Sequence, residues 1–159
     1  MAADPLLGNL LIVGGVGSGK SYLAACVRAV ILARACPVLW INAATYMGLV
    51  KRGFHNSEMA HLAGEKASAA ERSRVLVLDD LGKVHPSKDV SFVEEIFYSI
   101  VDARYRNELP IIVTTEWNSE GLAQRVGPSV TSRLQHDAVV CGLKKPTQEY
   151  RSLAMDTDG

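Results

Sequence analysis

One short stretch near the start of the chain constrains its fold more than any other. Residues 10–13 (LLIV) are consecutive apolar residues, and residues 14–21 (GGVGSGKS) follow them directly. The glycine-rich segment fits the pattern G-x-x-x-x-G-K-[S/T] at every fixed position, and residues that favour a helix come after it. A strand that leads through such a turn into a helix is the setting in which this pattern binds the phosphates of a nucleotide. The sequence therefore predicts a phosphate-binding loop, or P-loop.

The residue types of this loop suit the task, because backbone N–H groups can converge on a phosphate only where side chains are small. Lys20 is expected to reach the β- and γ-phosphates, and the Ser21 hydroxyl is expected to ligate Mg²⁺. A plain connecting turn would have no use for this Lys-Ser pair. The predicted cofactors are therefore ATP and Mg²⁺. The residues expected to contact the nucleotide are Gly15, Val16, Gly17, Ser18, Gly19, Lys20, Ser21 and Tyr22.

A second pattern follows in the middle of the chain. Residues 75–78 (VLVL) are apolar, and Asp79 and Asp80 come directly after them. Such a pair could be a turn or a helix cap, but a P-loop upstream favours a Walker B motif. Asp79 is then expected to hold the Mg²⁺ ion through water, and Asp80 to polarise the attacking water as general base.

The rest of the chain indicates the fold class. Further apolar runs at 37–42, 109–115 and 138–141 predict three more strands, and helical spacing of apolar residues fills most of the sequence between them. Strands that alternate with helices predict an α/β fold with a parallel sheet. The length of 159 residues fits one domain over 1–159, with a lead-in at 1–8 and a disordered tail at 152–159. Residues 43–73 are expected to be helical, with interruptions at their glycines.

Composition leaves several questions to local features. Seventeen basic and seventeen acidic residues cancel, so net charge gives no argument for nucleic-acid binding. No apolar run could span a bilayer and no secretory signal is visible, so we expect a soluble, cytoplasmic protein.

Three charged residues lie near the end of the helix expected around 89–107, namely Asp102, Arg104 and Arg106. They are expected to be mostly solvated or to meet a neighbouring subunit. A local basic and aromatic cluster could bind single-stranded DNA, or could be an ordinary solvated helix face. Its members are Tyr46, Lys51, Arg52, Phe54 and His55.

The motifs together lead to a family. The segments GGVGSGKSYLAA, VLVLDDLGK, IIVTTEWNSEGLAQRVG and VTSRL resemble the AAA+ ATPases. More closely, they resemble the branch of DnaC-type replicative helicase loaders and IstB-type transposition helper ATPases, over residues 8–151. The resemblance implies a P-loop NTPase fold of three α/β/α layers. It also implies a five-stranded parallel sheet of order 5-1-4-3-2, no or a reduced helical lid, and ATP bound at a subunit boundary in a homo-oligomer.

The same resemblance implies roles for residues late in the chain. Arg133 matches the arginine finger that reaches the ATP of the neighbouring subunit, although it could instead form a salt bridge within its own subunit. Thr115 lies at the end of the sensor strand. The family usually has Asn after the two threonines, whereas this chain has Glu116, and Asn118 is the nearest amide. The sensor is therefore Thr115, Glu116 or Asn118, and hydrolysis is expected to be slow.

Several functions remain open at this stage. The first is an ATPase that loads a replicative helicase onto single-stranded DNA, stimulated by assembly or by DNA. A transposition helper that acts on a transposase is the closest alternative. A low-turnover, nucleotide-gated binding module is another alternative, because Glu116 stands where the family usually has the sensor Asn. A P-loop kinase is disfavoured, because transfer to a metabolite does not need the second acid of the Asp79-Asp80 pair.

Overall fold

The computed structural model describes residues 8–83 and 90–145, so the expected tail at 152–159 and all of the lead-in except Gly8 lie outside the described residues. Strands and helices alternate along most of the chain, as predicted. Within the described ranges, no helix has the length and apolar character needed to cross a membrane. The elements are β1 (Leu10–Gly14), α1 (Lys20–Ala33), β2 (Val38–Asn42), α2 (Ala43–Gly53), α3 (Ser57–Arg72), β3 (Val75–Asp79), α4 (Val90–Arg106), β4 (Ile111–Thr115), α5 (Ser119–Val126), α6 (Pro128–Gln135) and β5 (Val139–Leu143).

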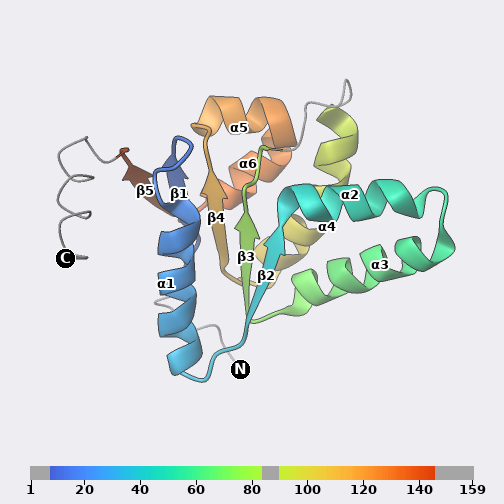
Figure 1. Ribbon diagram of the computed structural model, residues 1–159, viewed down its shortest axis with the longest axis horizontal. Helices are drawn as coiled ribbons and strands as arrows, with labels where there is room; N and C mark the ends of the chain where they lie inside the picture. Colours follow the sequence, from blue (N-terminus) through green and yellow to red (C-terminus); the bar gives the residue numbers. More distant parts are fainter. Residues whose placement is uncertain (1–7, 84–89, 146–159) are drawn as a thin grey trace, which may run out of the picture.

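The five strands form one parallel sheet in the order β2-β3-β4-β1-β5. This is the expected order 5-1-4-3-2 counted from the other edge, so the predicted fold is confirmed. The register pairs Asn42 with Asp79, and Val13 with Thr115. The strands therefore end together, and the segments that follow them meet at the carboxyl edge of the sheet (Figure 1).

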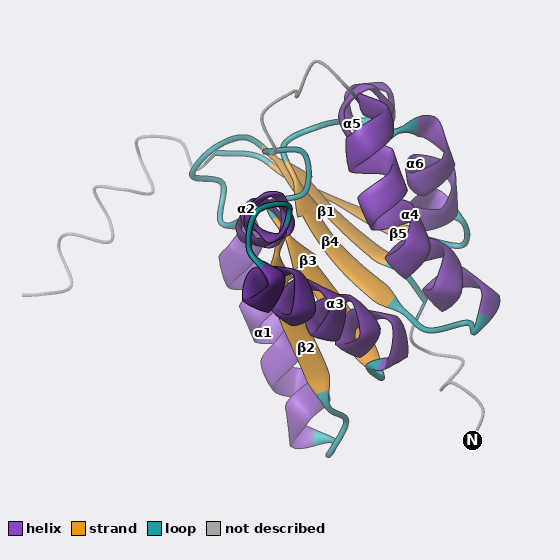
Figure 2. Cartoon of the chain, turned by 90° about the vertical axis from the view of Figure 1, so that its right-hand side faces the viewer, coloured by secondary structure: helices purple, strands orange, loops and turns teal. Residues whose placement is uncertain are grey.

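The two faces of the sheet are covered unequally. Side chains alternate along β3, so Leu76 and Leu78 face one apolar core while Val75 and Val77 face the other. The larger core receives buried residues from α2, α3, α4, α5 and α6. The smaller core is covered by α1, through Ala24 and Ile31 (Figures 1 and 2). All of β3 is buried, as its unbroken apolar sequence predicts.

The helical stretch expected over 43–73 is interrupted once rather than at each glycine. Gly48 and Gly64 lie inside α2 and α3, and the chain turns only after Gly53. A Cβ on Gly53 would lie 2.9 Å from the Cα of Ala60, so the two helices approach too closely there for any side chain. Asn56 then begins α3, because its side chain accepts hydrogen bonds from the N–H groups of Glu58 and Met59.

The expectation that the charges late in α4 are mostly solvated is wrong for two of the three. Asp102 is 5% exposed and Arg104 is fully buried. The Arg104 guanidinium donates to the carbonyls of Ala70 (2.6 Å), Ser73 (2.8 Å) and Pro110 (2.7 Å). It therefore ties the end of α3 to the segment that leads into β4. Burial lowers the pKa of Arg104 to about 10, since removal from water disfavours the charged form.

Candidate nucleotide-binding site

The P-loop connects β1 to α1 at the carboxyl edge of the sheet. Gly17 and Gly19 have φ angles of 74° and 88°, in the left-handed region that favours glycine. A Cβ at either position would meet nothing within 4 Å, so the described residues leave open space at the loop. Gly19 precedes α1 without a side-chain cap, which leaves the first N–H groups of the helix available to an anion.

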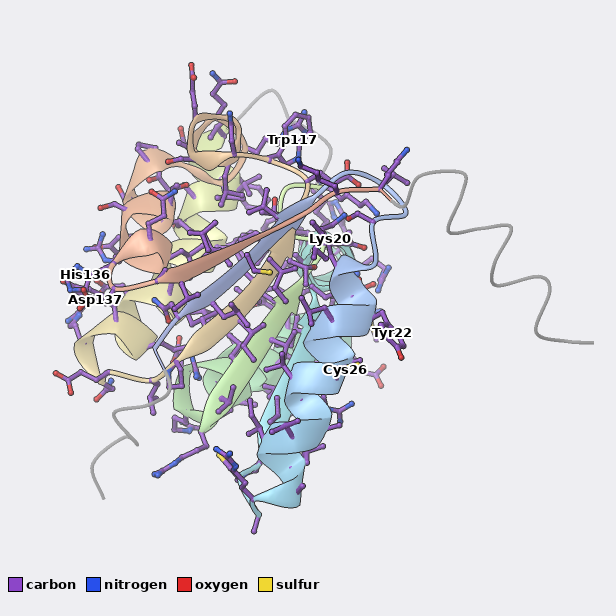
Figure 3. The ribbon with its side chains drawn as sticks, turned by 90° about the vertical axis from the view of Figure 1, so that its left-hand side faces the viewer. Lys20, Tyr22, Cys26, Trp117, His136 and Asp137 are labelled. Carbon is purple, nitrogen blue, oxygen red and sulfur yellow. The ribbon has the colours of Figure 1, made fainter. Side chains whose placement is uncertain are left out.

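Two further residues of the loop support this interpretation. The Lys20 side chain is 6% exposed and folds back over the loop, where Nζ donates to the carbonyl of Gly15 at 2.9 Å. Figure 3 shows Lys20 at the head of α1. The Ser18 hydroxyl is buried and has no hydrogen-bond partner within the described structure. An unsatisfied buried hydroxyl beside uncapped N–H groups fits a ligand with many acceptor oxygens, as a triphosphate has.

Two of the residues predicted to contact the nucleotide have large apolar or aromatic side chains on the surface. Val16 is 62% exposed and Tyr22 is 77% exposed. Tyr22 projects from the outer face of α1, one turn before Cys26 (Figure 3).

A chain of hydrogen bonds joins the P-loop to the adjacent strands β3 and β4. The Ser21 hydroxyl donates to Asp79 Oδ1 at 2.8 Å, and the Thr114 hydroxyl donates to the same oxygen at 2.7 Å. Asp79 is only 8% exposed. The structure thus brings together the two residues predicted to hold Mg²⁺. Mg²⁺ commonly takes one or two protein oxygens and completes its shell with water and phosphate, so this pair fits the ion.

Asp80 is held in an unusual conformation one residue further on. Its φ angle is 57°, in a region that residues other than glycine seldom adopt. Its N–H donates to the Thr114 hydroxyl at 2.8 Å, which fixes the backbone there. Strained backbone of this kind is often found at functional sites. The Asp80 carboxylate lies 3.3 Å from Lys83 Nζ.

Lys83 also approaches the acid that replaces the expected sensor asparagine. Its Nζ lies 3.6 Å from Glu116 Oε1, so one ammonium group faces the carboxylates that follow two adjacent strands. The hydrogen bond with Asp80 is the main cause that raises the pKa of Lys83 above its usual value. Sequence reasoning did not assign a role to Lys83 or to Thr114. The signal for Thr114 was its place on β4 beside Walker B, but nothing local indicated Lys83.

The other two candidate sensors are engaged with backbone groups. Thr115 is 1% exposed, and its hydroxyl donates to the carbonyl of Leu81 at 2.7 Å. The Asn118 side chain caps α5 by accepting a hydrogen bond from the N–H of Gly121 at 2.9 Å. Of the three candidate sensors, Glu116 is the one that approaches Lys83, which also contacts Asp80.

Arg133 lies at the opposite edge of the sheet. The Asn9 side chain, just before β1, donates to the carbonyls of Arg133 and Leu134 at 3.4 and 3.3 Å. The P-loop follows the other end of β1, roughly 16 Å further along a strand of this length. His136, directly beyond α6, accordingly lies across the molecule from Lys20 in Figure 3. In the described structure Arg133 donates to Asp102 at 2.8 Å and to the Tyr98 hydroxyl at 2.9 Å, as in the intrasubunit alternative.

The basic and aromatic cluster separates into exposed and buried members. Phe54 is 63% exposed, and its ring lies 5.6 Å from that of Phe92. Lys51, Arg52 and His55 are also exposed around the turn between α2 and α3. Tyr46 does not belong to this surface, because it is 5% exposed and packs edge-on against Phe97 in the core.

Comparison with known proteins identifies related chains. No protein-family model matches the sequence. The replicative helicase loader DnaC of Escherichia coli K12 is 30% identical over 134 residues, which cover 83% of this chain and 52% of that protein. The chain thus spans about half the length of this curated relative.

Solved structures agree with the sequence relationship. A crystal structure of the DnaC helicase loader matches with a TM-score of 0.69 at 25% identity, over 86% of this chain and 78% of that one. The replication initiator DnaA bound to AMPPCP and single-stranded DNA matches with a TM-score of 0.70 at 19% identity, over 87% and 41%, which is a likeness of the fold. Motifs, sheet order and both relationships agree, and this chain belongs to the AAA+ ATPases, in their DnaC-type branch.

Proposed function

We propose that this chain binds ATP with Mg²⁺ and hydrolyses ATP, as the ATPase domain of a replicative helicase loader. The observation that carries the proposal is the hydrogen-bonded connection from Ser21 through Asp79 to Thr114. This connection joins the P-loop to Walker B in the arrangement that a metal-bound triphosphate requires. Asp80 follows immediately, where its carboxylate can serve a water molecule.

Each residue has a separable role in this proposal. The loop from Gly15 to Ser21 binds the phosphates, and Lys20 exchanges its bond with the Gly15 carbonyl for phosphate oxygens. Ser21 and Asp79 hold Mg²⁺, which neutralises charge on the phosphates. Asp80 accepts the proton of the attacking water. Thr115 supports the site indirectly, because its bond to the Leu81 carbonyl fixes the turn that follows Walker B.

Arg133 is proposed to act on the ATP of a neighbouring subunit. It lies at the wrong edge of the sheet to reach its own P-loop, so a catalytic role requires a second copy of the chain. It must also exchange Asp102 and Tyr98 for phosphate oxygens on assembly. A guanidinium placed there stabilises the charge that develops in phosphoryl transfer.

The proposed partners are a replicative helicase and single-stranded DNA. The loader name of the DnaC relative favours a helicase over the transposase of the alternative helper function. The DnaA neighbour was solved with single-stranded DNA and a nucleotide analogue, so a similar fold can accommodate both. Phe54, with Lys51 and Arg52 on the preceding turn of helix, offers an exposed ring beside two cations on which a base could stack.

The test is ATP turnover per subunit as a function of protein concentration, with and without single-stranded DNA. We expect the rate to rise with concentration, because the active site is shared, and to rise again with DNA. Asp80→Asn should retain ATP binding and lose at least about 100-fold in turnover, the usual contribution of a general base. Arg133→Ala should remove the dependence on concentration, and Phe54→Ser should remove the effect of DNA.

Lys66→Met on the exposed face of α3 is a matched control that should leave all of these rates unchanged. ATP binding with a flat, near-zero rate at every concentration would favour the low-turnover binding module. Turnover that is equal in the wild type and Asp80→Asn would remove Asp80 from the mechanism.

A further inference from the structure

We propose that Lys83 is a positioning residue that makes Glu116 compatible with a bound triphosphate and orients Asp80. This inference rests on the proposed ATP binding and specifies how the site accommodates the terminal phosphate of ATP. It starts from the departure at Glu116, where an acid replaces the amide that the family usually has.

The tight turn after Walker B determines where Lys83 lies. The N–H of Lys83 donates to the carbonyl of Asp80 at 3.2 Å, which closes residues 80–83 into a turn. The N–H of Leu81 donates to the carbonyl of Thr114 at 2.9 Å, which attaches the turn to β4. The turn therefore places the Lys83 side chain near Asp80 and Glu116, although it stays 46% exposed.

A second contact locks this turn from the side of α5. The guanidinium of Arg125 lies 3.6 Å from the centre of the Trp117 ring and donates to the carbonyl of Gly82 at 3.3 Å. Gly82 has a φ angle of 97°, and a Cβ there would lie 2.6 Å from Trp117. No other residue fits this position without moving the ring. Trp117 lies at the same end of the molecule as Lys20 in Figure 3.

The position of Lys83 matters because of the negative charge on Glu116. Glu116 Oε1 is buried and has no hydrogen-bond partner in the described part of the chain, and Lys83 is the cation that approaches it, at 3.6 Å. An uncompensated acid beside the P-loop would repel the terminal phosphate of ATP, because like charges disfavour each other most strongly where water is excluded. ADP lacks that phosphate, so the repulsion would fall mainly on ATP.

The same ammonium group contacts Asp80 at 3.3 Å. Asp80 therefore has its backbone fixed by Thr114 and its carboxylate held by Lys83. Two effects of Lys83 can therefore be measured separately. It lowers the cost of Glu116 for ATP binding, and it keeps Asp80 in place for turnover.

The experiment compares ATP and ADP affinity by titration calorimetry, and kcat, in Lys83→Met, Glu116→Gln and the double variant. We expect Lys83→Met to weaken ATP about fivefold or more, the size of one charge contact near the surface, and ADP less than about twofold. Adding Glu116→Gln to Lys83→Met should restore ATP affinity but not kcat, because Asp80 still lacks its partner. Lys83→Arg should keep both, and Lys66→Met is the matched control.

Equal effects on ATP and ADP, or no restoration by Glu116→Gln, would overturn the inference. If the ATP-specific effect and its restoration are observed while no variant turns over ATP, the inference on binding stands and the proposed hydrolysis fails. If the wild type hydrolyses ATP but Lys83→Met matches it in affinity and kcat, the inference alone fails.

Discussion

The two edges of the sheet use polar side chains in opposite ways. At the amino edge, the Arg104 guanidinium and the Asn9 amide are bonded to carbonyls of the chain's own backbone. At the carboxyl edge, Ser21, Asp79 and Thr114 bond to one another, and the N–H groups at the head of α1 have no side-chain cap. Polar groups that bond to the chain's own backbone hold the fold together, whereas the uncapped N–H groups of α1 and the unpartnered Ser18 hydroxyl can bind a ligand.

The comparison predicts that the largest loss of stability follows a change at the amino edge. Arg104→Met removes a buried cation that bonds to at least three carbonyls from two segments. Those carbonyls would then lose their shortest hydrogen bonds, and the carbonyls of Pro110 and Ala70 would be left with the 3.3 Å bonds from the Leu76 N–H and the Ser73 hydroxyl. We expect the free energy of unfolding to fall by about 3–5 kcal/mol, as when one side of a buried charged network is removed. Chemical denaturation with an unchanged m-value measures this loss.

Arg104→Lys separates charge from geometry in the same experiment. Lysine keeps the cation but cannot reach carbonyls on both sides with a planar fork. It should therefore recover only part of the loss. Full recovery by lysine would mean that the charge rather than the hydrogen-bond geometry stabilises this edge. Folded Arg104→Met should still bind ATP with wild-type affinity.

The reverse pattern is expected at the carboxyl edge. Lys20→Ala removes the cation that lies over the P-loop, so ATP affinity should fall by about 100-fold, the value of a strong charge-assisted contact to phosphate. Its free energy of unfolding should change by less than about 1 kcal/mol, because within the described residues the Lys20 side chain makes one hydrogen bond, to the Gly15 carbonyl. Titration calorimetry and denaturation of the same sample measure both. A large stability loss with normal ATP affinity would remove the distinction between the two edges.

The sequence predicts the carboxyl edge well because its signals are local. Residues 14–21 and 79–80 are contiguous motifs, and the structure brings Ser21 and Asp79 together as the motifs require. The amino edge was not predictable in this way, because two of the three carbonyl partners of Arg104 lie 31 and 34 residues away. Its position near a helix end looked solvated in the sequence, yet the end of α3 covers it.

Lys83 and Tyr46 illustrate the same limit within and near the site. The contact between Lys83 and Glu116 depends on two turns that follow different strands. Tyr46 has the residue type of a stacking platform, but its place on α2 directs it into the core against Phe97. Residue type alone predicts neither the contact of Lys83 nor the burial of Tyr46, because both depend on the segments that pack against these side chains.

The smallest expected effect concerns Asp102, which accepts a hydrogen bond from Arg133, the predicted arginine finger. Hydrogen bonds from Arg106 and then Arg133 hold the pKa of Asp102 below its ordinary value of 3.8. A carboxylate with a lowered pKa in the folded state contributes stability that is complete above the unfolded pKa and is lost as the pH falls through the folded pKa. The wild type should therefore have a higher free energy of unfolding than Asp102→Asn at neutral pH, and this difference should decrease as the pH falls below about 4.

Thermal unfolding of the two proteins at neutral pH and near about pH 3 tests this directly. The difference in Tm should be largest at neutral pH and shrink in acid, because protonation of Asp102 in the unfolded state removes the stability that its ionised form contributes. Asp102→Asn should also weaken the hold on Arg133, so turnover should reach its plateau at a lower protein concentration if release of Arg133 limits assembly. A pH-independent Tm difference would show that Asp102 acts through packing, and the two edges would then differ in hydrogen bonding rather than in charge.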